Sequence, residues 1–99
     1  MARRQINFDK TEVVVGFPAG RRFVVLNLSY QDIQRIQFDE TREFSFFRKV
    51  PSEKLTIVTG KRPQPIVYTK KNQKQFWSDY KEKFTKFAKD NNITFADYT

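Results

Sequence analysis

The chain has 99 residues, of which 38% are hydrophobic and 16% aromatic, and its 19 Lys and Arg outnumber 11 Asp and Glu to give a formal charge of +8. This length allows a single domain over residues 1–99, and the absence of Cys excludes disulfides and thiolate metal ligands. Because His is also absent, the commonest general base and metal ligand are missing, and we expect no enzyme, no cofactor and no metal site.

Short β-branched and aromatic runs separated by turn residues fill the first two thirds of the chain. They predict seven strands, at residues 5–8, 11–17, 23–28, 33–38, 43–47, 54–59 and 66–68. We expect residues 39–42, with the sequence DETR, to form a hairpin loop, and residues 51–52 to end the fifth strand. Gly16 predicts a bend or bulge in the second strand.

Residues 72–91 have the pattern of one amphipathic helix. On a helical projection its apolar side chains fall within one arc of about 120°, and every Lys, Asp, Glu, Ser and Thr lies outside it. These side chains are Phe76, Trp77, Tyr80, Phe84, Phe87 and Ala88. At this spacing the stripe is typical of a helix packed on a sheet rather than of a ligand groove. The tail at residues 92–99 keeps Ile93, Phe95 and Tyr98, so both folding back and fraying stay open.

The element order and two local passages resemble the bacterial pleckstrin-homology-like (PH-like) domains. LNLSYQDIQRIQF at 26–38 is similar to a strand, Tyr-x-x-Ile-x-x-Ile, strand passage of that family, and FWSDYKEKF at 76–84 is similar to its closing helix. The resemblance implies a mostly β fold, a bent seven-stranded antiparallel barrel or two-sheet sandwich capped by the helix at about 72–91. It also implies a bacterial, non-catalytic module that binds other macromolecules. An open α+β sheet with the helix across one face is the alternative.

Pairs of basic residues recur at strand ends and turns, where a barrel gathers charge at one rim. The pairs are Arg3-Arg4, Arg21-Arg22, Arg48-Lys49, Lys61-Arg62 and Lys70-Lys71. We take Arg21, Arg22, Lys61, Arg62, Lys70 and Lys71 as candidate anion-binding residues. A solubilising role explains the same charge, and the basic first hairpin with which eukaryotic PH domains grip phosphoinositides is represented only by Lys10.

Apolar residues on both faces of the strands at 11–17 and 23–28 suggest a contact surface. Val14, Val24 and Phe47 are the candidate interface residues if they face outward. The leading hypothesis is a non-catalytic domain that binds a protein partner or itself, and the alternative is a binder of anionic membrane or nucleic acid. The start MARRQINF has no signal-like apolar run and no segment is apolar enough to cross a bilayer, so we expect a cytoplasmic location.

Overall fold

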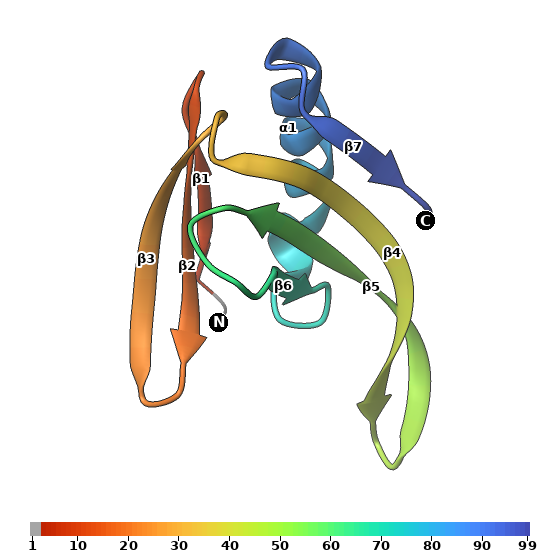
Figure 1. Ribbon diagram of the computed structural model, residues 1–99. Helices are drawn as coiled ribbons and strands as arrows, with labels where there is room; N and C mark the ends of the chain where they lie inside the picture. Colours follow the sequence, from red (N-terminus) through yellow and green to blue (C-terminus); the bar gives the residue numbers. More distant parts are fainter. Residues whose placement is uncertain (1–2) are drawn as a thin grey trace.

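Two long antiparallel hairpins organise the chain, and each belongs to a separate sheet (Figure 1). The computed structural model describes residues 3–99. Its elements in chain order are β1 (Ile6–Phe8), β2 (Glu12–Ala19), β3 (Arg22–Ser29), β4 (Ile33–Ser45), β5 (Arg48–Thr59), β6 (Ile66–Thr69), a 3₁₀ turn η1 (Lys74–Phe76), α1 (Trp77–Asp90) and β7 (Thr94–Asp97). The mostly β class with one C-terminal helix and seven strands is therefore confirmed.

The strands form a three-stranded sheet in the order β1-β2-β3 and a four-stranded sheet in the order β6-β5-β4-β7. The prediction allowed either a bent barrel or two sheets. The structure has two sheets, and they are not closed into a barrel. All neighbours are antiparallel except β4 and β7, which pair in parallel from Arg35↔Thr94 to Phe38↔Asp97. The hydroxyl of Tyr68 in β6 donates to the backbone carbonyl of Gly16 in β2 at 2.6 Å and joins the sheets through a buried hydrogen bond.

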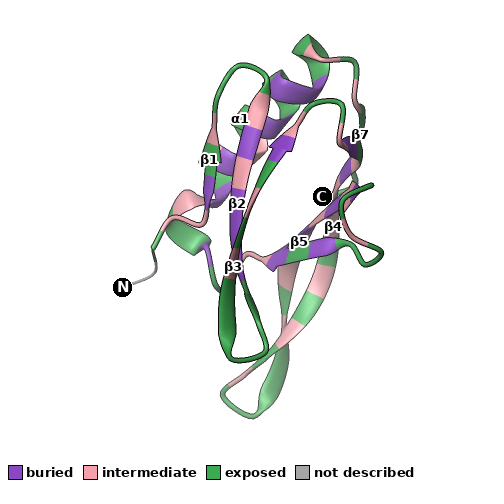
Figure 2. Cartoon of the chain, turned by 60° about the vertical axis from the view of Figure 1, so that its left-hand side comes forward, coloured by how far each residue is buried: buried purple, intermediate pink, exposed green. Residues whose placement is uncertain are grey.

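The core lies between the two sheets and α1, where the buried residues of all three meet (Figure 2). Because successive side chains of a strand point to opposite faces, β2 contributes Val13, Val15 and Phe17 to the interior. The helix contributes Trp77, Tyr80, Phe84, Phe87 and Ala88, which confirms the predicted apolar stripe. The Phe84 ring is 4.7 Å from that of Phe8 and 6.3 Å from that of Phe38, both in edge-on arrangements, so it joins both sheets to the helix.

The helix boundaries differ modestly from the predicted 72–91. A 3₁₀ turn precedes α1, so the capping position of α1 is Phe76 and that of the 3₁₀ turn is Gln73. Neither makes a capping hydrogen bond with its side chain, and Asn72 caps neither element. Gln73 is instead buried, where it accepts a hydrogen bond from the Tyr80 hydroxyl and donates to the carbonyl of Arg3 at 3.0 Å. At the other end Asn92 takes the left-handed conformation at φ 54°, and the chain folds back as β7.

The predicted loop at residues 39–42 is wrong. Those residues lie inside β4, which runs without a break from Ile33 to Ser45, so the predicted strands 33–38 and 43–47 are one strand. The predicted break at 51–52 is also wrong, because β5 begins at Arg48 and Pro51 pairs with Arg42. The seventh strand is β7, which follows the helix.

Candidate interaction surface

The outer parts of β4 and β5 form a two-stranded ribbon that leaves the body of the protein. In β4 only residues 35–38 pair with β7, and in β5 only residues 54–57 pair with β6. Residues 39–45 and 48–53 therefore pair with each other and with no third strand in the part of the chain that the structure describes. At about 3.3 Å per residue the ribbon is about 20 Å long, and it projects from the molecule in Figure 1. We call this ribbon, residues 39–53, the arm.

Two phenylalanines form the turn at the end of the arm. Ser45 pairs with Arg48, so Phe46 and Phe47 alone connect the strands, at φ 50° and 66°. A two-residue turn with both φ values positive is the geometry that Asn-Gly favours, because side chains with a Cβ are strained there. The left-handed conformation costs about 1–2 kcal/mol per residue. The two side chains are nevertheless 93% and 94% exposed, so no packing within the protein offsets this cost.

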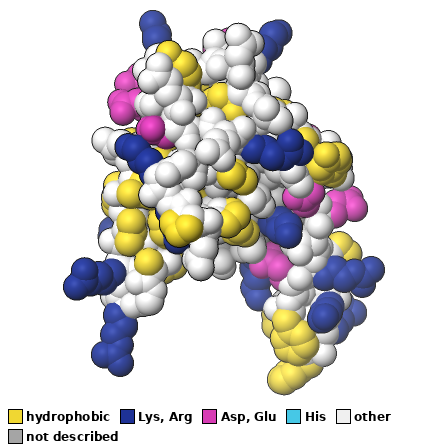
Figure 3. All heavy atoms as spheres, viewed as in Figure 1, with side chains coloured by type: hydrophobic (Ala, Val, Ile, Leu, Met, Phe, Trp, Pro, Cys, Tyr) yellow, Lys and Arg dark blue, Asp and Glu magenta, His cyan; other side chains and the backbone are white. Residues whose placement is uncertain are grey.

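Basic side chains lie on the outer part of the arm, next to this aromatic tip. Arg42, Arg48 and Lys49 are exposed, and within residues 3–99 none of the three pairs with a carboxylate. Phe44, which is 63% exposed, adds a third aromatic ring on the arm. Figure 3 shows yellow side chains at the very end of this projection with blue ones just above them.

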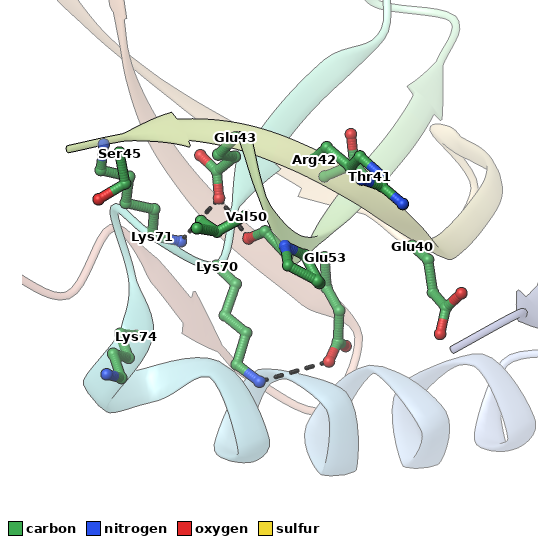
Figure 4. A pocket seen from close by; sticks show the side chains of 12 residues that line it. Glu40, Thr41, Arg42, Glu43, Ser45, Val50, Glu53, Lys70, Lys71 and Lys74 are labelled. Atoms are coloured by element: carbon green, nitrogen blue, oxygen red, sulfur yellow. Dashed lines mark hydrogen bonds and ion pairs between the residues drawn. The ribbon is translucent and has the colours of Figure 1, made fainter. Parts of the chain in front are cut away.

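Side chains that line a groove between the arm and the segment before the helix hold the arm in place (Figure 4). The Glu43 carboxylate accepts hydrogen bonds from the Ser52 hydroxyl and from the backbone N–H of Lys71, the latter at 3.4 Å. The Lys71 ammonium donates to the carbonyl of Phe44 at 2.9 Å. The Glu43 carboxylate is thus engaged within the protein, and Arg42, Arg48 and Lys49 outnumber it on the outer part of the arm.

Glu53 forms the centre of the ion pairs in this groove. Its carboxylate is 2.7 Å from the Lys81 ammonium and 3.3 Å from that of Lys70, and it accepts a hydrogen bond from the Trp77 indole at 3.1 Å. Partial burial acts to raise the pKa of Glu53, but the hydrogen bonds from Lys81 and Trp77 outweigh it and hold the pKa below its usual value. Glu53 therefore stays ionised and ties β5 to the helix and to Lys70.

A second hairpin tip lies on the same side of the molecule. Beyond Gly16, β2 pairs only with β3, and the turn between them carries Arg21 and Arg22, both exposed. Figures 1 and 2 show this tip and the arm directed the same way, and Figure 3 shows blue side chains at both ends. Neither arginine pairs with an acidic group of residues 3–99.

The other predicted anion-binding residues are engaged within the fold. Lys61 lies 3.4 Å from the Asp32 carboxylate and donates to the carbonyl of Asn27 at 3.1 Å. The Arg62 guanidinium stacks on the Phe17 ring at 4.6 Å. Lys70 pairs with Glu53, and Lys71 bonds to Glu43 and Phe44 in the groove described above. Of the six candidates, Arg21 and Arg22 are the two that the structure leaves without such partners in its described part.

The three predicted interface residues have different surroundings. Phe47 is at the tip of the arm and is almost fully exposed. Val14 is half-buried on the outer face of the first sheet, and Val24 packs against the core, so the outward orientation required for an interface role does not hold for Val24. The outer face instead exposes Phe23 and Val25, at 58% and 59%.

Sequence reasoning missed Phe46 and Arg42 as surface residues of the tip. The sequence carried one relevant signal, the continued alternation of apolar and polar residues through EFS, which favours a strand that runs past residue 42. It carried no turn signal at Phe46, where neither Gly, Asn nor Asp is present.

Residues 3–99 contain no group of three or more acidic side chains placed to hold a metal ion, and none of their helices is long and apolar enough to span a membrane. Comparisons of the chain with protein-family models, with curated proteins and with solved structures found no match. The assignment of a role therefore depends on the surface chemistry of the chain itself.

Proposed function

We propose that this protein is a non-catalytic binding module whose binding element is the tip of the arm. The observation that carries the proposal is the pair Phe46 and Phe47, which are almost fully exposed in a strained turn that contributes nothing visible to packing. Backbone strain that the fold does not repay concentrates at functional sites, where the geometry is needed for contact with something else. The resemblance to PH-like domains, which often bind other macromolecules at their surface, supports the same role.

The arrangement suits binding rather than transport of a small ligand. A two-stranded ribbon encloses no cavity at its tip, so its side chains contact whatever surface the tip meets. The anchoring of Glu43 and Glu53 in the groove holds the arm in one orientation, which lowers the entropy lost on binding. We therefore expect binding to depend on the tip residues and to be insensitive to the exposed face of α1.

Site-specific photocrosslinking tests this function even though the partner is unidentified. p-Benzoylphenylalanine replaces Phe47 in the protein produced in its native cell, and the matched control carries the same group in place of Thr85, which is exposed on α1. We expect adducts from position 47, whatever their chemical class, that position 85 does not give. Equal adducts from both positions, or none from position 47, would refute the proposed function.

A second candidate function is self-association at the outer face of the first sheet. It is favoured by β3, an edge strand whose Phe23 and Val25 are exposed and whose residues 23–29 carry no charge. Sedimentation equilibrium of the parent and of V25K distinguishes it, because a dimer through this face would dissociate in the variant.

A further inference from the structure

We propose that the surface bound by the arm is an anionic lipid bilayer, into which Phe46 and Phe47 insert while the basic residues of both hairpin tips contact the headgroups. This inference depends on the proposed function and names its partner. It concerns shallow, charge-selective insertion, with no pocket for one particular headgroup.

The shape of the tip favours a bilayer as the medium that covers it. Phe46 and Phe47 are 93% and 94% exposed at the end of a ribbon with which, within residues 3–99, no third strand pairs beyond residues 39 and 53. A flat protein surface covers one side of such a tip, whereas the boundary between headgroups and acyl chains surrounds it. Interfacial anchors of proteins reach about 5–10 Å into that boundary, a depth that the terminal residues of the arm provide.

Along the arm, apolar side chains at the end are followed by basic ones, as the acyl chains of a membrane are followed by its anionic headgroups. The aromatic rings are at the apex, and Arg48 and Lys49 follow them directly in β5. Long basic side chains beside an inserted apolar segment extend to the headgroup layer, where each contributes to attraction by anionic lipid. Phe44 lies opposite Lys49 in the ladder and extends the apolar surface one step toward the body of the protein.

The second hairpin supplies charge at the same membrane plane. Arg21 and Arg22 are at the tip that points the same way as the arm, so one flat surface meets both tips (Figures 1 and 3). A contact at two separated points is suited to an extended plane. It also leaves most of α1 on the side of the molecule away from both tips (Figure 1).

The structure disfavours nucleic acid as the partner. Single strands bind along a continuous basic groove in which bases stack on aromatic rings. Here the groove beside the arm is lined by Glu40, Glu43 and Glu53 as well as by lysines, and the basic tips are separate. A second copy of the chain is disfavoured at the tips because tip-to-tip contact would place Arg48 and Lys49 against their own equivalents.

Co-sedimentation of the full chain with vesicles tests the inference. Vesicles of phosphatidylcholine alone and of phosphatidylcholine with phosphatidylglycerol are compared at low and high salt, with single-stranded DNA under the same conditions. We expect binding to the anionic vesicles, weakened by salt, and little binding to phosphatidylcholine.

Variants separate insertion from charge attraction. F46N/F47G keeps a turn suited to the backbone and should weaken vesicle binding about 100-fold, since each buried Phe contributes about tenfold or more. R48Q/K49Q and R21Q/R22Q should each weaken it about tenfold or more. The matched control K86Q/K89Q removes the same charge from the C-terminal end of α1, which lies at the opposite end of the molecule from both tips in Figure 1, and should change binding less than about twofold. A tryptophan placed by F47W should show quenching by brominated lipid, whereas the native Trp77 is buried.

The outcomes distinguish the two proposals. Equal vesicle binding by the parent and F46N/F47G, or no vesicle binding at low salt, would overturn bilayer insertion. If position 47 then crosslinks to a protein, or DNA binding requires the two phenylalanines, the arm is still the binding element and only its partner is wrong. If position 47 gives no specific adduct either, both proposals fail.

Discussion

Replacing the two phenylalanines at the end of the arm should make the protein more stable. In F46N/F47G the left-handed strain, about 1–2 kcal/mol per residue, is largely relieved. The greater freedom of Gly in the unfolded chain opposes this by about 0.5–1 kcal/mol. Exposure above 90% means that almost no packing is lost with the rings. The expected net gain is about 1–3 kcal/mol, and each kcal/mol raises the Tm of a chain of this length by about 4–8 °C.

Urea unfolding followed by the fluorescence of the buried Trp77 measures the gain as a higher midpoint with an unchanged m-value. The control F46A/F47A removes the rings and keeps a Cβ at both positive φ values, so its midpoint should stay close to that of the parent. Hydrogen exchange of the arm amides locates the effect, since exchange should slow in residues 39–53 of F46N/F47G. A loss of stability in F46N/F47G would show that the rings stabilise the fold, and the functional interpretation of the tip would then lose its basis.

Three further predictions concern the body of the protein. F84A should cost about 3–5 kcal/mol, measured by the same unfolding assay, because its ring joins both sheets to α1; an unchanged midpoint would contradict the core assignment. Y68F should cost about 1–3 kcal/mol by leaving the carbonyl of Gly16 unpaired, and a midpoint equal to that of the parent would contradict a role in joining the sheets. The pKa of Glu53 in the folded protein is below its ordinary value of 4.5, so the ionised carboxylate contributes stability above pH 4.5. That contribution is lost as the pH falls through the folded pKa. E53Q should therefore lose less stability in acid than the parent, and parallel pH profiles of the two proteins would refute this.

The helix and the first sheet were predictable because their apolar patterns are local. The stripe from Trp77 to Ala88 has helical spacing, and a helix buries such a face against whichever sheet it meets. Likewise Gly20 lies in the two-residue turn between β2 and β3, although β2 runs two residues past its predicted end and includes Pro18 and Ala19. These signals lie within a few residues of the elements that they predict.

The arm escaped prediction because its residues resemble a loop. Both faces of a two-stranded ribbon are solvated, so polar residues are favoured throughout, and Asp39 and Thr41 pair with Lys54 and Ser52 across the ladder. Pro51 is tolerated in β5 because the ribbon has free edges there. The turn that the structure shows, Phe46-Phe47, contains no Gly, Asn or Asp, the residues by which a turn with positive φ is recognised in a sequence.

Strand β7 escaped prediction for a different reason. Its pairing with β4 joins residues far apart in the chain, and nothing in TFAD signals a parallel partner. Phe95 supplies the cause, because its ring lies 6.1 Å from that of Phe38 and brings the tail onto the open edge of the second sheet. Covering that edge also removes a site at which another chain would pair.

The contacts across the groove fix the orientation of the arm. An isolated two-stranded hairpin is marginally stable in water, so a ribbon that projects from its sheet needs support from the side. Lys71 gives that support with two bonds, from its backbone N–H to Glu43 and from its ammonium to the carbonyl of Phe44. Because Lys71 lies in the short turn before η1 and α1, the position of the helix fixes the direction of the arm. The helix that closes the core therefore also aligns the aromatic tip with Arg21 and Arg22 of the second hairpin, and a surface that binds one tip is presented to the other.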